Sequence, residues 1–102
     1  MAAEIDVVKG LKAIETLKVD LMKAQCLFHE GTLNGSEKEI LQGLAQMVGL
    51  SYLLTKSLGY DYARLDRTLI QTLEQWQNTE KADLEEQWGD IGMLLGYLVP
   101  EE

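Results

Sequence analysis

Three carboxylates near the end of the sequence have the spacing of a metal site on one helix. Asp83, Glu86 and Asp90 are three and four residues apart, so a continuous helix would place them within a sector of about 60°. Such carboxylates suit a hard divalent cation such as Mg²⁺. The sector would lie roughly 125° from the apolar stripe of that helix, which favours helix capping and an ion pair from Asp90 to Arg64 or Arg67. A weak metal or ligand site is the alternative.

Other reactive side chains stand apart from one another in the sequence. His29 has no second His or Cys at ligand spacing, which argues against zinc, and a position near a helix end already favours a cation. Cys26 is one position off an apolar stripe, and we expect it to be a small packed residue. Nucleophilic catalysis would need a base that the sequence does not place. No catalytic residue can therefore be assigned.

The charge balance limits the partners. Nine Lys and Arg against 17 Asp and Glu give a net charge of −8 over 102 residues, which repels nucleic acid and anionic lipid. No apolar run approaches the roughly 20 residues that span a bilayer. One cysteine cannot form an internal disulfide, which favours a reducing compartment. We expect a cytoplasmic protein that binds neither nucleic acid nor membrane.

Apolar periodicity near 3.6 residues predicts four helices and no strands. The first spans about residues 4 to 30, with Gly31 as its stop. The second begins after Ser36, which with Glu39 forms a capping box, and closes at Gly59. The third begins after Asp61. The fourth begins near residue 83 and ends before residue 100. The expected stripes are Ile14, Leu17, Leu21, Ala24 and Phe28 in the first helix, Tyr62, Leu65, Leu69, Leu73 and Trp76 in the third, and Leu84, Trp88, Ile91, Leu95 and Leu98 in the fourth.

The second helix has no consistent polar face. Apolar residues occur all round it between residues 40 and 54, and Gly43 and Gly49 would let a neighbour approach closely. Three other helices are too few to cover it within one protomer. We therefore predict a single all-α domain over residues 1–102 that assembles as a homodimer.

Several segments of the chain resemble the MazG-like family, over about residues 8 to 98. They are SEKEIL (residues 36–41), YLLTKSLGYDY (52–62), LD (65–66), and EQWGD (86–90) followed by LL (94–95). The resemblance implies a four-helix MazG-like bundle, dimeric or tetrameric. The chain is also similar to the wider set of all-α nucleoside triphosphate pyrophosphohydrolases. That similarity implies Mg²⁺-dependent release of pyrophosphate from a nucleotide.

The sequence departs from that set at the metal-binding motifs. The resemblance places an E-x-x-D pair at Gly43 and Gln46, and no carboxylate occurs between Glu39 and Asp61. No E-x-x-E pair precedes them. These departures favour a non-catalytic dimeric module that binds a nucleotide or a partner protein. The alternative is an active pyrophosphohydrolase that holds Mg²⁺ in a rearranged acidic site.

Overall fold

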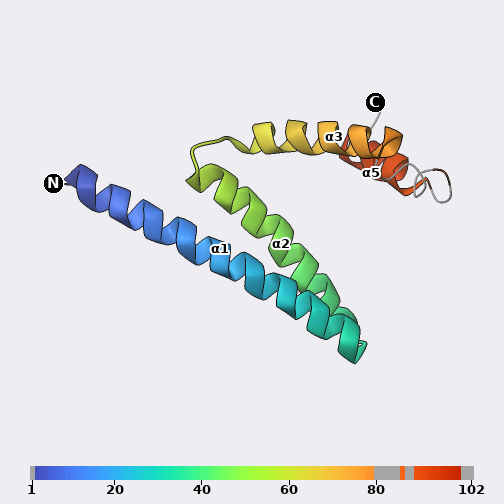
Figure 1. The fold of residues 1–102 in the computed structure, drawn as a ribbon, viewed down its shortest axis with the longest axis horizontal. Helices are drawn as coiled ribbons and strands as arrows, with labels where there is room; N and C mark the ends of the chain where they lie inside the picture. The colour runs from blue at the N-terminus through green and yellow to red at the C-terminus, as the bar shows by residue number, and fades with distance from the viewer. Residues whose placement is uncertain (1, 80–85, 87–88, 100–102) are drawn as a thin grey trace. The chain divides into compact units, whose positions relative to one another are not determined.

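The computed structural model describes residues 2–79, 86 and 89–99. Its helices are α1 (Ala2–Asn34), α2 (Glu37–Ser57), α3 (Tyr62–Asn78) and α5 (Asp90–Leu98), as Figure 1 shows. The described residues contain no strand, which confirms the all-α prediction. None of the helices described combines the length and the hydropathy needed to cross a membrane.

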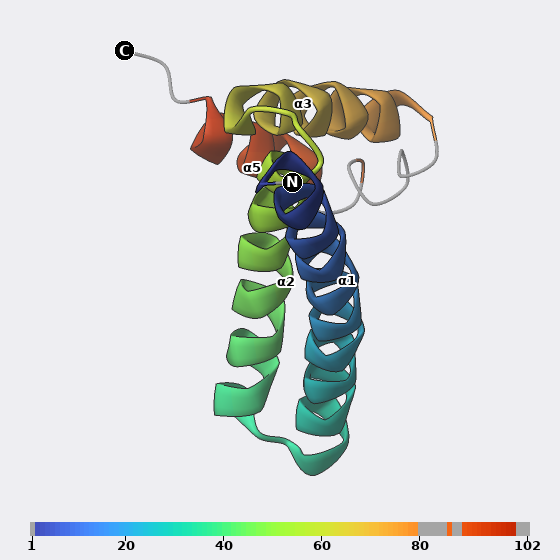
Figure 2. The same cartoon turned by 90° about the vertical axis from the view of Figure 1, so that its left-hand side faces the viewer.

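The chain divides into two compact units, Met1–Tyr62 and Ala63–Glu102. The first unit is a hairpin in which α1 and α2 run antiparallel, side by side, in both Figure 1 and Figure 2. The second unit contains most of α3 and all of α5. A single domain over residues 1–102 remains a prediction.

The turn between α1 and α2 differs from the expected one. Helix α1 continues through Gly31 to Asn34, so the predicted stop at Gly31 is wrong. The left-handed residue that ends α1 is Gly35, with φ of 66°, and the N–H of Ser36 donates to the Gly31 carbonyl at 2.9 Å. Gly31 has a packing role instead. It is buried, and a Cβ there would lie 2.7 Å from the backbone nitrogen of Ile40 on α2.

Both ends of α2 follow from the sequence. The Ser36 hydroxyl accepts from the backbone N–H of Glu39 at 3.2 Å, as the capping-box prediction requires. The Ser36 N–H, which the Glu39 side chain was expected to reach, donates instead to the Gly31 carbonyl. At the other end Gly59 has φ of 95°, and its N–H donates to the Lys56 carbonyl at 3.0 Å. The predicted end at Gly59 is thus confirmed.

The hairpin packs along the predicted stripe of α1. Ala24 is fully buried, and the other members of the stripe are half-buried, namely Ile14, Leu17, Leu21 and Phe28. On α2, Gly43 is buried in the same interface. Gly49, expected to allow an equally close approach, has nothing within 4 Å of an added Cβ. Close contact between the two helices is therefore centred near the turn.

One side of α2 is not covered by α1. Leu41, Leu44 and Val48, spaced by three and four residues, are 57%, 42% and 59% exposed. We call these three residues the α2 stripe. Within the first unit α2 is thus less enclosed than its sequence suggested, because α1 covers only one side of it. The uncovered side is where a further helix would have to bind.

The second unit confirms one predicted helix and corrects another. Helix α3 begins directly after Asp61, and Leu73 from its expected stripe is buried. The expected fourth helix is not continuous. Gly89 has φ of 67°, a left-handed conformation, and α5 begins only at Asp90, with Ile91 buried. The predicted start near residue 83 lies outside the described residues.

Candidate functional site

The α1–α2 hairpin contains the two positions at which the family resemblance would place carboxylates. One of them, Gly43, is closed by packing. A Cβ added there would lie 2.7 Å from the backbone nitrogen of Phe28 and 2.9 Å from its Cα. Backbone atoms of a helix cannot move aside as a flexible side chain does. This position therefore has no room for a carboxylate side chain.

The other position, Gln46, is exposed and lines an open hollow of about 430 Å³ between α1 and α2. Asp20 and Lys23 from α1 line the same hollow, and its remaining wall is Gly49, Leu50 and Leu53. The hollow thus offers one carboxylate, one neutral amide and one ammonium group. Mg²⁺ requires several oxygen ligands, and a nearby ammonium repels it. The residues present do not fit the ion that the resemblance implies.

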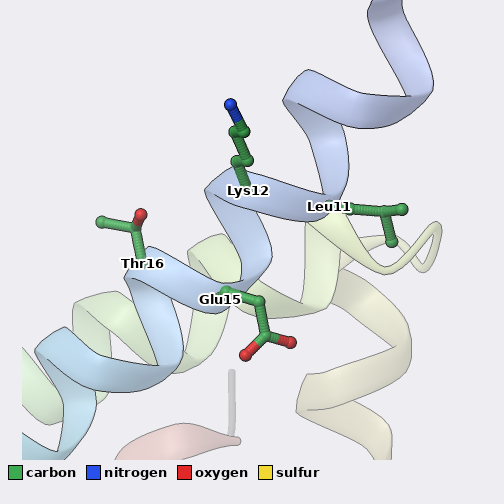
Figure 3. Close-up of a pocket in the computed structure, with 4 residues that line it drawn as sticks. All are labelled: Leu11, Lys12, Glu15 and Thr16. Atoms are coloured by element: carbon green, nitrogen blue, oxygen red, sulfur yellow. The ribbon is translucent and has the colours of Figure 1, made fainter. Parts of the chain in front are cut away.

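The remaining described residues do not provide another metal centre. Among them no group of three or more His, Cys, Asp or Glu side chains could hold a metal ion. The hollow in Figure 3 is lined by four residues of α1, with Lys12 and Glu15 pointing in different directions. Glu15 pairs with Lys18 at 3.0 Å. A hollow in the second unit is lined by residues of α3 and α5 and by Val99, and Glu74 is the only charged group among these described residues.

The three carboxylates singled out in the sequence are not held on one continuous helix. Asp83 lies outside the described residues, Glu86 is helical and exposed, and Asp90 is the exposed first residue of α5. Gly89 interrupts the helix between Glu86 and Asp90, so the argument for a shared sector is wrong. Asp90 instead lies in the first turn of α5, where the helix dipole favours a negative charge. Metal binding by the three residues remains an untested prediction.

Thermal melting distinguishes a structural role for these carboxylates from a ligand role. We expect millimolar Mg²⁺ or Mn²⁺ to leave the melting temperature of the wild-type protein unchanged, because a helix-start carboxylate needs no cation. Asp90→Ala should lower stability by at most about 1 kcal/mol. Glu86→Ala removes another of the three carboxylates and is measured in the same way. Stabilisation of the wild type by metal, lost in both variants, would contradict this expectation.

Two other residues discussed from the sequence are placed clearly. Cys26 is exposed, so its predicted packed position is wrong for the single chain. The reason is the angle: Cys26 is two residues from the buried Ala24, or about 200° around the helix. His29 is exposed, and its ring contacts Phe28 edge-on at a centroid distance of 5.5 Å.

Sequence reasoning missed one feature of α1. Val19, Met22, Cys26 and Leu33 lie on the side of α1 that faces away from α2, and all four are exposed. The signal was present in the spacing of three, four and seven residues.

An antiparallel helical hairpin followed by shorter helices places the described chain among small all-α proteins. The profile of the MazG-like family matches residues 7–91, and the chain belongs to that family. Neither a curated protein nor a solved structure matches it.

Proposed function

We propose that this protein is a non-catalytic, self-associating module with the MazG-like fold. The observation that carries the proposal is the packing of Gly43 against the Phe28 backbone. The Phe28 backbone occupies the space that a carboxylate side chain at residue 43 would need. In the wider set of pyrophosphohydrolases this position is expected to hold a metal-binding carboxylate. Loss of the second position to Gln46, in a hollow that also holds Lys23, supports the same conclusion.

The charge of the chain supports it as well. A nucleoside triphosphate brings about four negative charges to a protein whose net charge is −8, and without a bridging cation the two repel each other. Lys18, one of the six lysines of the hairpin, is paired with Glu15. Residues 1–62 hold six lysines against eight Asp and Glu, so the first unit has no excess of positive charge with which to neutralise a triphosphate.

Self-association is the role that the surface favours. The α2 stripe exposes three large apolar side chains on one side of a helix. Apolar rows of this kind are covered in helical proteins by another helix, and a second copy related by two-fold symmetry brings the same row. The proposed module is therefore a homodimer formed through α2.

The test of the catalytic half of the proposal is a pyrophosphate assay. Purified protein should release no pyrophosphate from the canonical nucleoside and deoxynucleoside triphosphates in the presence of Mg²⁺, because the hairpin cannot hold the ion. Release that disappears in EDTA would contradict the proposal. Loss of that release in Glu86→Ala or Asp90→Ala would then assign it to the rearranged acidic site.

A further inference from the structure

The turn of the hairpin contains an asparagine followed by a glycine. Asn34 is the last residue of α1, and Gly35 follows it with the left-handed φ of 66°. Both residues are exposed. The side-chain amide of an asparagine can react with the backbone nitrogen of the next residue, and a glycine there has no Cβ to shield that nitrogen. The turn therefore brings together the two groups that deamidation requires.

Neither reacting group is held by a hydrogen bond within the described residues. The Asn34 side chain has no partner there, and no backbone acceptor is found for the Gly35 N–H. The turn after α2 is different, since the Gly59 N–H donates to the Lys56 carbonyl at 3.0 Å. Asn34 lies at a helix end, and helix ends fray, so the rotation that brings its side chain to the Gly35 nitrogen is local.

The chain holds one other asparagine, and it lacks these features. Asn78 is exposed as well, but its Nδ2 donates to the Glu74 carbonyl at 3.0 Å. The next residue is Thr79, whose branched side chain crowds its own backbone nitrogen. Asn78 is therefore an internal control for the same chemistry.

We propose that Asn34 is a modification site, at which the folded protein deamidates through a cyclic imide formed with Gly35. The Gly35 nitrogen bonds to Cγ of Asn34, and its proton goes with the side-chain amide group, which leaves as ammonia. Water then opens the ring. Cleavage between Cγ and the nitrogen gives aspartate, whereas cleavage between the Asn34 carbonyl carbon and the nitrogen gives isoaspartate, in which the chain runs through Cγ. Nothing is oxidised or reduced, and water is the only co-reactant.

The isoaspartyl product changes the turn that closes the hairpin, because it adds one carbon atom to the backbone. The Ser36 N–H donates to the Gly31 carbonyl at 2.9 Å across these residues, and the Ser36 hydroxyl accepts from the Glu39 N–H at 3.2 Å. The added carbon alters the separation of these groups. Gly31 also packs against the backbone of α2, so we expect the isoaspartyl form of the hairpin to be less stable than the parent form.

Ageing of the purified protein tests the site. After several days at mildly alkaline pH, peptide mapping by mass spectrometry should show Asn34 converted at least about tenfold faster than Asn78. Isoaspartate in the product is identified by its resistance to a protease that cleaves at aspartate. Asn34→Gln keeps the amide and the charge but would have to form a larger ring, so it should show no conversion.

Thermal melting of the aged samples tests the effect on the hairpin. Aged wild-type protein should contain a fraction that melts at a lower temperature than fresh protein, whereas aged Asn34→Gln should melt as before. Fresh Asn34→Asp has the new charge without the extra backbone carbon. It should melt close to the wild type, because the charge lies between the end of α1, whose dipole disfavours it, and the start of α2, whose dipole favours it.

Two results would overturn the proposed site: conversion of Asn34 in urea but not in the native protein, and equal conversion of Asn34 and Asn78. An isoaspartyl form that melts like fresh protein would overturn the effect on the hairpin. The turn lies outside the α2 stripe, so none of these results depends on the proposed self-association.

Discussion

Replacement of Gly43 by leucine is expected to destabilise the protein by about 3 kcal/mol or more, and to lower its melting temperature by about 10 °C or more. The physical reason is the position of the first added atom. A Cβ at residue 43 would lie 2.7 Å from the Phe28 nitrogen, closer than carbon and nitrogen approach without bonding. Because the obstacle is helix backbone, relief requires α1 and α2 to separate along the hairpin.

Alanine at the same position isolates this effect from side-chain size. Gly43→Ala gains about 1 kcal/mol of helix propensity, yet we expect a net loss of stability, since the added Cβ already collides with Phe28. Gly31→Ala should behave in the same way, because its Cβ would lie 2.7 Å from the Ile40 nitrogen.

Gly49 is the matched control on the same helix. Nothing lies within 4 Å of a Cβ added there, so Gly49→Ala should raise the free energy of unfolding by about 0.5–1 kcal/mol. Chemical denaturation followed by circular dichroism measures all four variants. Equal effects at Gly43 and Gly49 would show that propensity, and not helix contact, governs the hairpin.

The comparison of these glycines shows how far the sequence could predict the fold. Periodicity and capping residues located α2 well, because Ser36 and Gly59 act through local backbone geometry, and α3 begins directly after Asp61 as predicted. Gly31 was misassigned as a helix stop, since a glycine required for close packing looks the same in a sequence as one required for a left-handed turn. The two roles can be distinguished only in the structure, where Gly31 lies against α2.

The candidate site was also predictable only in part, because some of its features depend on the backbone conformation and not on residue types. The missing carboxylates at Gly43 and Gln46 could be recognised once the family resemblance had placed the metal-binding motif at those positions. The interruption at Gly89 could not, because a glycine inside an apolar repeat is tolerated in many helices. Its positive φ removes the common helix on which the argument for Glu86 and Asp90 depended.

Glutamate at Leu41 is expected to halve the mass of the assembly in solution. Leu41 and Val48 belong to the α2 stripe and are 57% and 59% exposed in the single chain, so either substitution is compatible with the folded hairpin. In the α2-mediated dimer the same side chain would be buried. A carboxylate without a partner costs several kcal/mol in such an interface, and two-fold symmetry introduces it twice. The dissociation constant should therefore rise at least about 100-fold.

Gln42→Glu is the control for Leu41→Glu, because it adds the same charge at the next, exposed residue of α2 but on another side of the helix. Light scattering over a concentration series should show the control unchanged and Leu41→Glu dissociated. Unchanged circular dichroism of Leu41→Glu would confirm that the hairpin remains folded. If Leu41→Glu and Val48→Glu both keep the wild-type mass, the α2 stripe is not the contact between copies, and the surface that holds them together must be sought elsewhere on the chain.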